Sequence, residues 1–120
     1  LASAIDYIST LGMDRIAAYE QQLVNTAYER LQRINRIKFY GSDNRASILS
    51  FNLEGVHPHD AGSIMDRCGV AVRTGHHCAE PLMERLGTPG TVRASFAFYN
   101  TMEDVDVLVR SLEKVREIFP

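Results

Sequence analysis

The chain has 120 residues, of which 45% are hydrophobic and 23% charged, and its formal net charge is −2. These values are typical of one globular domain with a single core, and the charge indicates neither a nucleic acid nor a membrane partner. No apolar run approaches the roughly 20 residues that cross a bilayer. Because two cysteines are too few for a disulfide framework and no signal peptide is recognisable, we expect a cytoplasmic protein.

The first third of the chain is predicted to be helical. Residues 3–9 predict a short helix that ends near Gly12, and residues 13–35 predict a long amphipathic helix. The chain begins at Leu1 with a helical pattern already in progress, so we expect a fragment of a longer protein. Apolar residues of the long helix fall on one stripe, which predicts packing against a core: Met13, Ile16, Ala17, Leu23, Val24, Ala27, Leu31 and Ile34.

A hairpin and a third helix follow. Residues 37–40 and 46–53 predict two strands, because the segment 41–44 between them has turn chemistry. His57-Pro58-His59-Asp60 predicts a helix start, since proline suits the first helical position and an acidic residue suits the positive end of the helix dipole. The inner face of this helix is predicted to carry Ala61, Ile64, Met65 and Cys68, with Cys68 as a small buried residue and Gly69 ending the helix.

The last third predicts two more strands and two more helices. Residues 70–73 and 91–99 predict the strands, and residues 81–86 a short helix. The final helix runs to about residue 118 and begins with Thr101-Met102-Glu103-Asp104, which resembles a capping box with Asp in place of Glu. The order of helix, hairpin, helix, strand, strand and helix predicts an α+β fold, in which helices cover one face of a roughly four-stranded sheet.

One segment, Arg73-Thr74-Gly75-His76-His77-Cys78, carries the chemistry. The reactive form of a thiol is the thiolate, and cationic neighbours favour it. Strand alternation places Arg73 and Arg93 on the face opposite the valines of their strands, so both should lie near Cys78 on the face without helices. Because an arginine fork binds carboxylates in bidentate fashion, the pattern predicts a site for a small carboxylate beside a thiol. The alternative is two surface arginines in salt bridges.

Four segments then carry a family resemblance. They are Ala71-Val72-Arg73-Thr74-Gly75-His76-His77-Cys78-Ala79, Pro81-Leu82-Met83, Arg93-Ala94-Ser95 and Tyr99-Asn100-Thr101. The chain resembles the C-terminal small domain of a SufS-type cysteine desulfurase, within the class V aminotransferase family of fold-type I pyridoxal phosphate enzymes. The resemblance covers residues 1–120 and implies that the large, cofactor-binding domain lies outside this chain.

The resemblance implies a reaction and partners. Cys78 would take sulfur from L-cysteine as a persulfide, giving alanine, and pass it to a SufE-type or SufU-type acceptor protein for iron–sulfur cluster assembly. Arg93 would bind the substrate carboxylate, and Arg73 would organise the loop and its electrostatics. The full-length parent would be a homodimer.

The histidines allow more than one interpretation. His76 and His77 either tune or deprotonate the thiol, or only shape the loop through hydrogen bonds. His59 resembles a histidine that takes over a zinc ligand when relatives dock a zinc-containing SufU-type acceptor; the alternative is a solvated residue at a helix start. No intrinsic metal site is expected, because the spacing matches no closed tetrahedral motif.

The cofactor lysine is missing from the pattern. Family members hold pyridoxal phosphate through a lysine Schiff base, but this chain has only Lys38 and Lys114, and neither lies in a matching motif. We therefore expect the isolated chain to be inactive. Alternative functions are a selenocysteine lyase or cysteine sulfinate desulfinase domain, a non-enzymatic sulfur-carrier or interaction domain, and a metal-binding domain.

Overall fold

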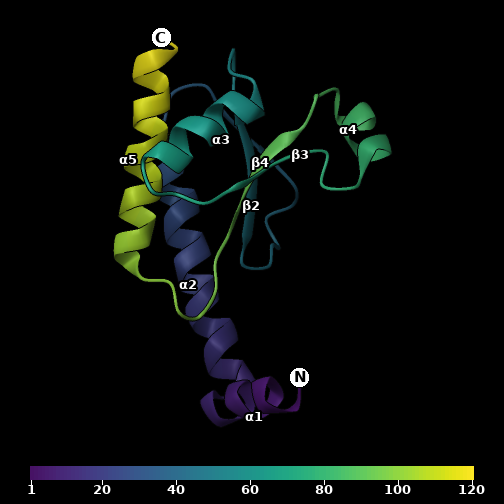
Figure 1. Ribbon diagram of the computed structural model, residues 1–120, viewed down its shortest axis with the longest axis vertical. Coiled ribbons are helices and arrows are strands. Elements are labelled where there is room, and N and C mark those ends of the chain that lie inside the picture. Colours follow the sequence, from purple (N-terminus) through teal and green to yellow (C-terminus); the bar gives the residue numbers. More distant parts are fainter.

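The computed structural model describes residues 1–120 as five helices and a four-stranded sheet (Figure 1). None of the helices combines the length and the hydropathy that a bilayer crossing needs. The elements in chain order are α1 (Ala2–Leu11), α2 (Met13–Leu31), β1 (Ile37–Tyr40), β2 (Ile48–Leu53), α3 (Pro58–Arg67), β3 (Arg73–Gly75), α4 (Glu80–Leu86), β4 (Thr91–Ser95) and α5 (Met102–Ile118).

The sheet has the strand order β1-β2-β4-β3, and every neighbouring pair is antiparallel. The predicted hairpin is formed by β1 and β2. Across the two central strands, Leu49 pairs with Ala94 and Phe51 pairs with Val92. Because side chains alternate along a strand, these four apolar residues share one face, and for β4 this is the face opposite Arg93 that alternation predicted.

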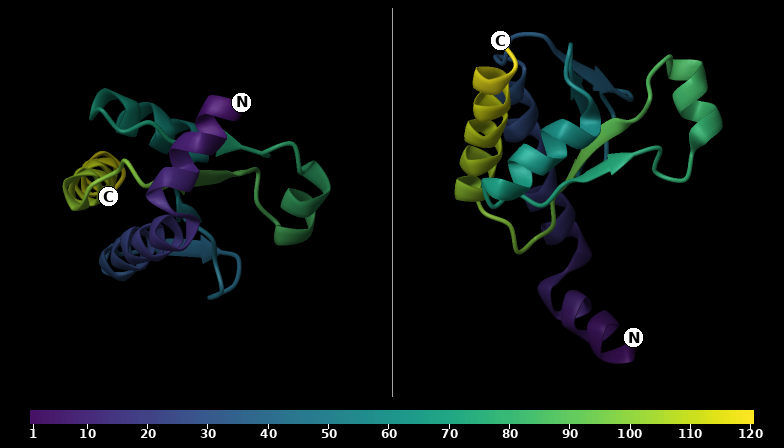
Figure 2. Two further views of the ribbon diagram at one scale, coloured as in Figure 1. Left: turned by 90° about the horizontal axis from the view of Figure 1, so that it is seen from below. Right: turned by 45° about the horizontal axis from the view of Figure 1, so that its top comes forward.

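Helices cover that apolar face, so the predicted α+β architecture is confirmed. In Figures 1 and 2, α2 and α3 lie against the sheet, and α5 packs across these two helices on the side away from it. Burying each large apolar side chain contributes about 1.5–3 kcal/mol before the entropy cost. The largest of the fully buried side chains come from the sheet and from all three helices: Phe51, Leu23, Leu31, Leu49, Met65 and Leu112.

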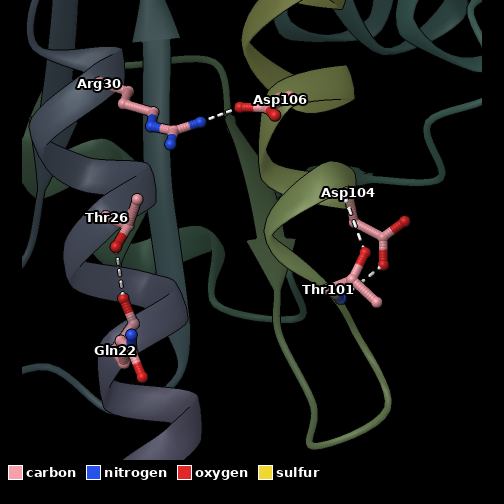
Figure 3. Close-up of polar contacts among 6 residues, drawn as sticks. All are labelled: Gln22, Thr26, Arg30, Thr101, Asp104 and Asp106. Atoms are coloured by element: carbon pink, nitrogen blue, oxygen red, sulfur yellow. Dashed lines mark hydrogen bonds and ion pairs between the residues drawn. The ribbon is translucent and has the colours of Figure 1, made fainter.

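Polar contacts fix the position of α5. The Thr101 hydroxyl accepts a hydrogen bond from the Asp104 N–H at 3.3 Å, and the Asp104 carboxylate accepts one from the Thr101 N–H at 2.9 Å (Figure 3). This is the predicted capping box, and the hydrogen bonds that the Asp104 carboxylate accepts from the Thr101 N–H and the Asn100 side-chain amide hold the pKa of Asp104 below its usual value. Two residues after Asp104, Asp106 pairs with Arg30 of α2. The capping box therefore stabilises the start of α5, and the ion pair ties that end of the helix to α2.

Helix α1 differs from the other helices, because it buries none of its residues. It extends away from the sheet at the N-terminal end of α2 (Figure 1), from which Gly12 separates it with a φ of 89°. Only glycine adopts that region at no steric cost. The ring centroids of Tyr7 and Phe98 lie 6.0 Å apart, which gives α1 one aromatic contact with the segment after β4.

Some predicted helix residues are placed differently. The long helix ends at Leu31, not 35, because the chain turns there and reaches β1 through Arg36 with a φ of 62°. Met13 and Ala17 are exposed, since after Ile16 the buried stripe of α2 resumes only at Leu23. Cys68, expected to be buried, is exposed: α3 ends one residue earlier, so Cys68 no longer continues its inner face.

The predicted strand boundaries also need correction. The second strand begins at residue 48 rather than 46, the third spans 73–75 rather than 70–73, and the fourth ends at Ser95 rather than 99. A cavity of about 200 Å³ lies where the β3–β4 ladder stops, between residues 69–72 and 94–96. Val70 and Val72 still pack against the core, so the predicted alternation is confirmed although the ladder begins later.

Candidate functional site

The face of the sheet opposite the helices carries a row of polar side chains. Arg93 on β4 pairs with Ser50 of β2 on one side and with Arg73 of β3 on the other. Side chains of directly paired residues point to the same face. The predicted convergence of the two arginines is therefore confirmed by the register.

The arginines have no acidic partner within the chain. The three salt bridges of the chain involve other cations, so the alternative of two salt-bridged surface arginines is wrong. Arg73 is exposed, whereas Arg93 is half-buried and its Nε atom is buried without a hydrogen-bond partner. A buried guanidinium donor of this kind favours an anionic ligand, because leaving it unpaired costs free energy.

Cys78 lies three residues beyond β3 in a tight turn. The Ala79 N–H donates to the His76 carbonyl at 2.9 Å, which closes the turn. Its two central residues, His77 and Cys78, both have positive φ, 54° and 59°. These values define a left-handed turn that usually contains glycine or asparagine. The turn presents Cys78 as an exposed, free thiol.

Close backbone packing holds the base of this turn. Gly75 at the end of β3 and Gly90 before β4 approach so closely that a Cβ built on Gly90 would lie 2.9 Å from the Gly75 carbonyl carbon and oxygen. Glycine at position 90 is therefore a steric requirement, and its φ of 157° adds to it.

His77 is the histidine that contacts the sheet. Its Nε2 lies 3.1 Å from the carbonyl oxygen of Thr91 and 2.9 Å from the Thr91 hydroxyl oxygen. A carbonyl only accepts, so Nε2 carries the proton and the buried Nδ1, which has no partner, is an acceptor. Burial lowers the pKa of His77, and Arg93, Arg73 and His76 lower it further, against an opposing effect of the Thr91 hydrogen bond. His77 is therefore neutral near pH 7.

The other predicted site residues lie apart from this contact. His76 is exposed at the start of the turn. His59 is exposed on the first turn of α3, on the helical side of the sheet, where it donates its backbone N–H to Nδ1 of His57 at 3.2 Å. No three histidine, cysteine, aspartate or glutamate residues are placed to hold a metal ion.

The sequence interpretation missed two residues of the site, Thr91 and Asn52. The Asn52 side-chain amide donates to the Gly90 carbonyl at 2.8 Å and to the Thr88 hydroxyl at 3.0 Å, and its oxygen accepts from the Val92 N–H at 3.3 Å. Strand alternation places Thr91 on the face of Arg93, which was the available signal. The role of Asn52 depends on register and had no local signal.

The residues of this chain do not fit a pyridoxal phosphate site. Lys38 is exposed on β1, where its Nζ lies 5.2 Å from the Tyr40 ring centroid, and β1 is two strands away from Arg93. Lys114 pairs with Glu117 on α5. The buried atoms without partners at the site, Arg93 Nε and His77 Nδ1, are one donor and one acceptor, which is too few to hold a phosphate and a pyridine ring.

Most of the chain matches a known protein family. Residues 1–108 match the family described as Aminotransferase class-V. A probable cysteine desulfurase from Staphylococcus aureus (strain COL) is 50% identical over 121 residues, which cover 99% of this chain and 29% of that relative.

Two solved structures also match. The apo structure of a cysteine desulfurase from Thermococcus onnurineus NA1 superposes with a TM-score of 0.90 and 42% identity, over 95% of this chain and 29% of that one. The cysteine desulfurase CsdA (S-sulfonic acid) from Escherichia coli has a TM-score of 0.90 and 32% identity, over 96% of this chain and 29% of that one. The chain thus spans less than a third of the relatives that it matches, and it belongs to the class-V aminotransferase family.

Proposed function

We propose that this chain is the small domain of a SufS-type, pyridoxal phosphate-dependent cysteine desulfurase, in which Cys78 accepts sulfur from L-cysteine. The observation that carries the proposal is the pairing of Arg73 with Arg93, without acidic partners, on the β-strands that flank an exposed thiol. Relatives named cysteine desulfurase at 42% and 50% identity support the same assignment.

The arginines divide the work of binding the substrate. Arg93 is half-buried with an unpaired Nε, so a carboxylate that reaches it forms charge-assisted hydrogen bonds away from bulk water. Arg73 is exposed and adds positive potential on the same face. Together they orient the α-carboxylate of an amino acid toward β4, with its side chain directed to the turn of Cys78.

The sulfur transfer balances as an exchange between two thiols. A bond forms between the Cys78 sulfur and the sulfur of L-cysteine, and the Cβ–S bond of the substrate breaks. The electron pair of that bond stays with the carbon fragment, which takes up the proton that the Cys78 thiol loses and leaves as L-alanine, and Cys78 becomes a persulfide. Pyridoxal phosphate supplies the electron sink for such carbon–sulfur cleavage, and the residues that hold it lie outside this chain.

The outer sulfur of the Cys78 persulfide must then be passed on to another protein. An exposed turn suits a thiol that meets a small substrate and afterwards a sulfur-acceptor protein, here of the SufE or SufU type, for iron–sulfur cluster assembly in the cytoplasm. His59 is exposed on α3 and is the candidate zinc ligand if the acceptor is of the SufU type. The whole enzyme would be a homodimer.

A chimeric enzyme tests the proposal. Residues 1–120 replace the matching segment of the Staphylococcus aureus relative, so that the thiol and arginines come from this chain and the cofactor residues from the relative. Alanine release from L-cysteine is expected, and Cys78→Ser should reduce it by at least about 10³-fold, because the nucleophile is lost. Cys68→Ser is the matched control and should keep full activity.

The chimera also separates the alternatives. Undiminished alanine release in the Cys78→Ser chimera would contradict the proposal. Higher turnover of L-selenocysteine or cysteine sulfinate than of L-cysteine would reassign the substrate. The 120-residue chain alone is expected to release no alanine from L-cysteine, and such release would refute the assignment of the cofactor residues to a segment outside this chain.

A further inference from the structure

We infer that His77 and Thr91 form a clamp that holds Cys78 at the apex of its strained turn, which makes both of them positioning residues. The clamp consists of the hydrogen bonds from His77 Nε2 to the carbonyl and hydroxyl oxygens of Thr91. The inference rests on the proposed function only in taking Cys78 as the reacting thiol. It assigns to His77 the loop-shaping role rather than proton transfer.

The turn needs such a restraint. His77 and Cys78 are consecutive residues with side chains in the left-handed region, at φ values of 54° and 59°. This conformation is costly for residues other than glycine, and it persists only where surrounding contacts impose it. Within the turn itself, the hydrogen bond from the Ala79 N–H to the His76 carbonyl is the one backbone restraint.

Thr91 is a suitable anchor because it is almost fully buried. Its side chain and backbone are 1% exposed, so water does not compete for its hydrogen bonds with His77. Thr91 lies two residues before Arg93 and therefore on the same face of β4. The clamp thus fixes the turn that carries the thiol to the strand that carries the half-buried arginine.

The anchor is itself held rigidly. Asn52 on β2 bonds to the Gly90 carbonyl and the Val92 N–H, on either side of Thr91. Gly90 also packs directly against the Gly75 backbone. Because both neighbours of Thr91 are fixed, breaking the clamp releases the turn and leaves β4 in place.

Two substitutions in the full 120-residue chain test the clamp. Thr91→Val removes the hydroxyl and keeps the volume, and Thr91→Ser is the conservative control that retains it. Hydrogen exchange of the Ala79 amide, which closes the turn, should become about fivefold faster in Thr91→Val, the effect of one neutral hydrogen bond. It should return to the original rate in Thr91→Ser, and it should be faster still in His77→Ala.

Two further measurements keep the test decisive. The amide of Phe51 reports global unfolding and should stay far more protected than that of Ala79 in every variant, which would show that Ala79 exchanges by local opening of the turn. Long-range ¹H–¹⁵N correlation of the imidazole should find the His77 proton on Nε2. A proton on Nδ1, or an unchanged Ala79 exchange rate in both Thr91→Val and His77→Ala, would overturn the clamp.

These measurements use neither L-cysteine nor cofactor, so their outcome does not depend on whether the parent protein is a desulfurase. In the chimeric enzyme, Thr91→Val should lower kcat for L-cysteine about tenfold while KM stays within about twofold, because the thiol is misplaced and the arginines are not. Fast Ala79 exchange together with an inactive parent chimera would support the clamp and contradict the proposed function. Fast exchange with a raised KM and an unchanged kcat would contradict the positioning role.

Discussion

One face of the sheet, the helical face, carries Leu49, Phe51 and Val92 under the helical layer. The other, the open face, carries Ser50, Arg93 and Arg73. At the open face, two buried atoms, Arg93 Nε and His77 Nδ1, have no hydrogen-bond partner. On the helical face, these apolar side chains pack in one core with buried side chains of α2, α3 and α5. On the second face like charges stand directly opposite each other, an arrangement that is destabilising by itself.

The two faces differ in how far the chain packs or pairs its own side chains. On the helical face the side chains are buried against one another, so their contribution to the stability of the fold explains why they are apolar. The open face keeps two unpaired arginines, a strained turn and a buried acceptor, each of which costs free energy. Local features that oppose stability are expected at functional sites, and here they gather on one face of one sheet.

The largest effect should come from opening the helical face. Phe51→Ala removes a fully buried ring from the centre of the core and should lower the free energy of unfolding by about 3–5 kcal/mol. Ser50→Ala, one residue away on the opposite face, is the matched control and should change it by less than about 0.5 kcal/mol. Urea unfolding followed by circular dichroism measures both, and equal losses would refute the contrast between the faces.

Removing the N-terminal cap of α5 should lower the free energy of unfolding by a smaller amount. Thr101→Ala removes the hydroxyl that caps α5 and should cost about 1 kcal/mol. Thr101→Ser keeps the cap and should lie close to the original stability in the same urea experiment. If Thr101→Ala were neutral, the Asp104 side of the capping box would be sufficient to hold the helix start.

Much of the helical face was accessible from the sequence because it depends on local periodicity. The stripe of α2, the alternation of β2 and β4 and the capping box of α5 are patterns within one element. Errors arose where an element ended, since the exposure of Cys68 and the late start of β3 depend on tertiary packing that no local pattern encodes. Register was also inaccessible, although alternation placed Arg73 and Arg93 on the correct face.

The open face was predictable in its residue types but not in its geometry. Cys78, Arg73 and Arg93 were recognisable from their residue types as a thiol close to two arginines on one face of the sheet. The left-handed turn was not, because positive φ is uncommon for any residue with a side chain, and His77 and Cys78 adopt it in the context of Thr91, Gly75 and Gly90. The two interpretations of His77 stayed open in the sequence for the same reason.

The titration of His77 should give the open face a pH dependence. Its pKa in the folded chain is lowered, mainly by burial, below the ordinary value of 6.5, so the unfolded chain binds this proton first. The contribution of His77 to stability is therefore complete above about pH 6.5 and declines as the pH falls toward the folded pKa. Urea unfolding between pH 5 and 8 should show a shallower decline in His77→Gln than in the original chain, and identical slopes would contradict a lowered pKa.

The smallest effect should have the opposite sign. Arg73 is exposed and stands directly opposite Arg93, so Arg73→Gln relieves a like-charge pair and should raise the free energy of unfolding by about 0.2–0.5 kcal/mol. Salt screens exposed charges, so the gain should disappear near 1 M sodium chloride, where the Debye length is about 3 Å. A destabilisation that persists at high salt would mean that Arg73 packs as a structural side chain. A gain that salt removes would mean that the open face retains a charge against its own stability, as a face built to receive an anion requires.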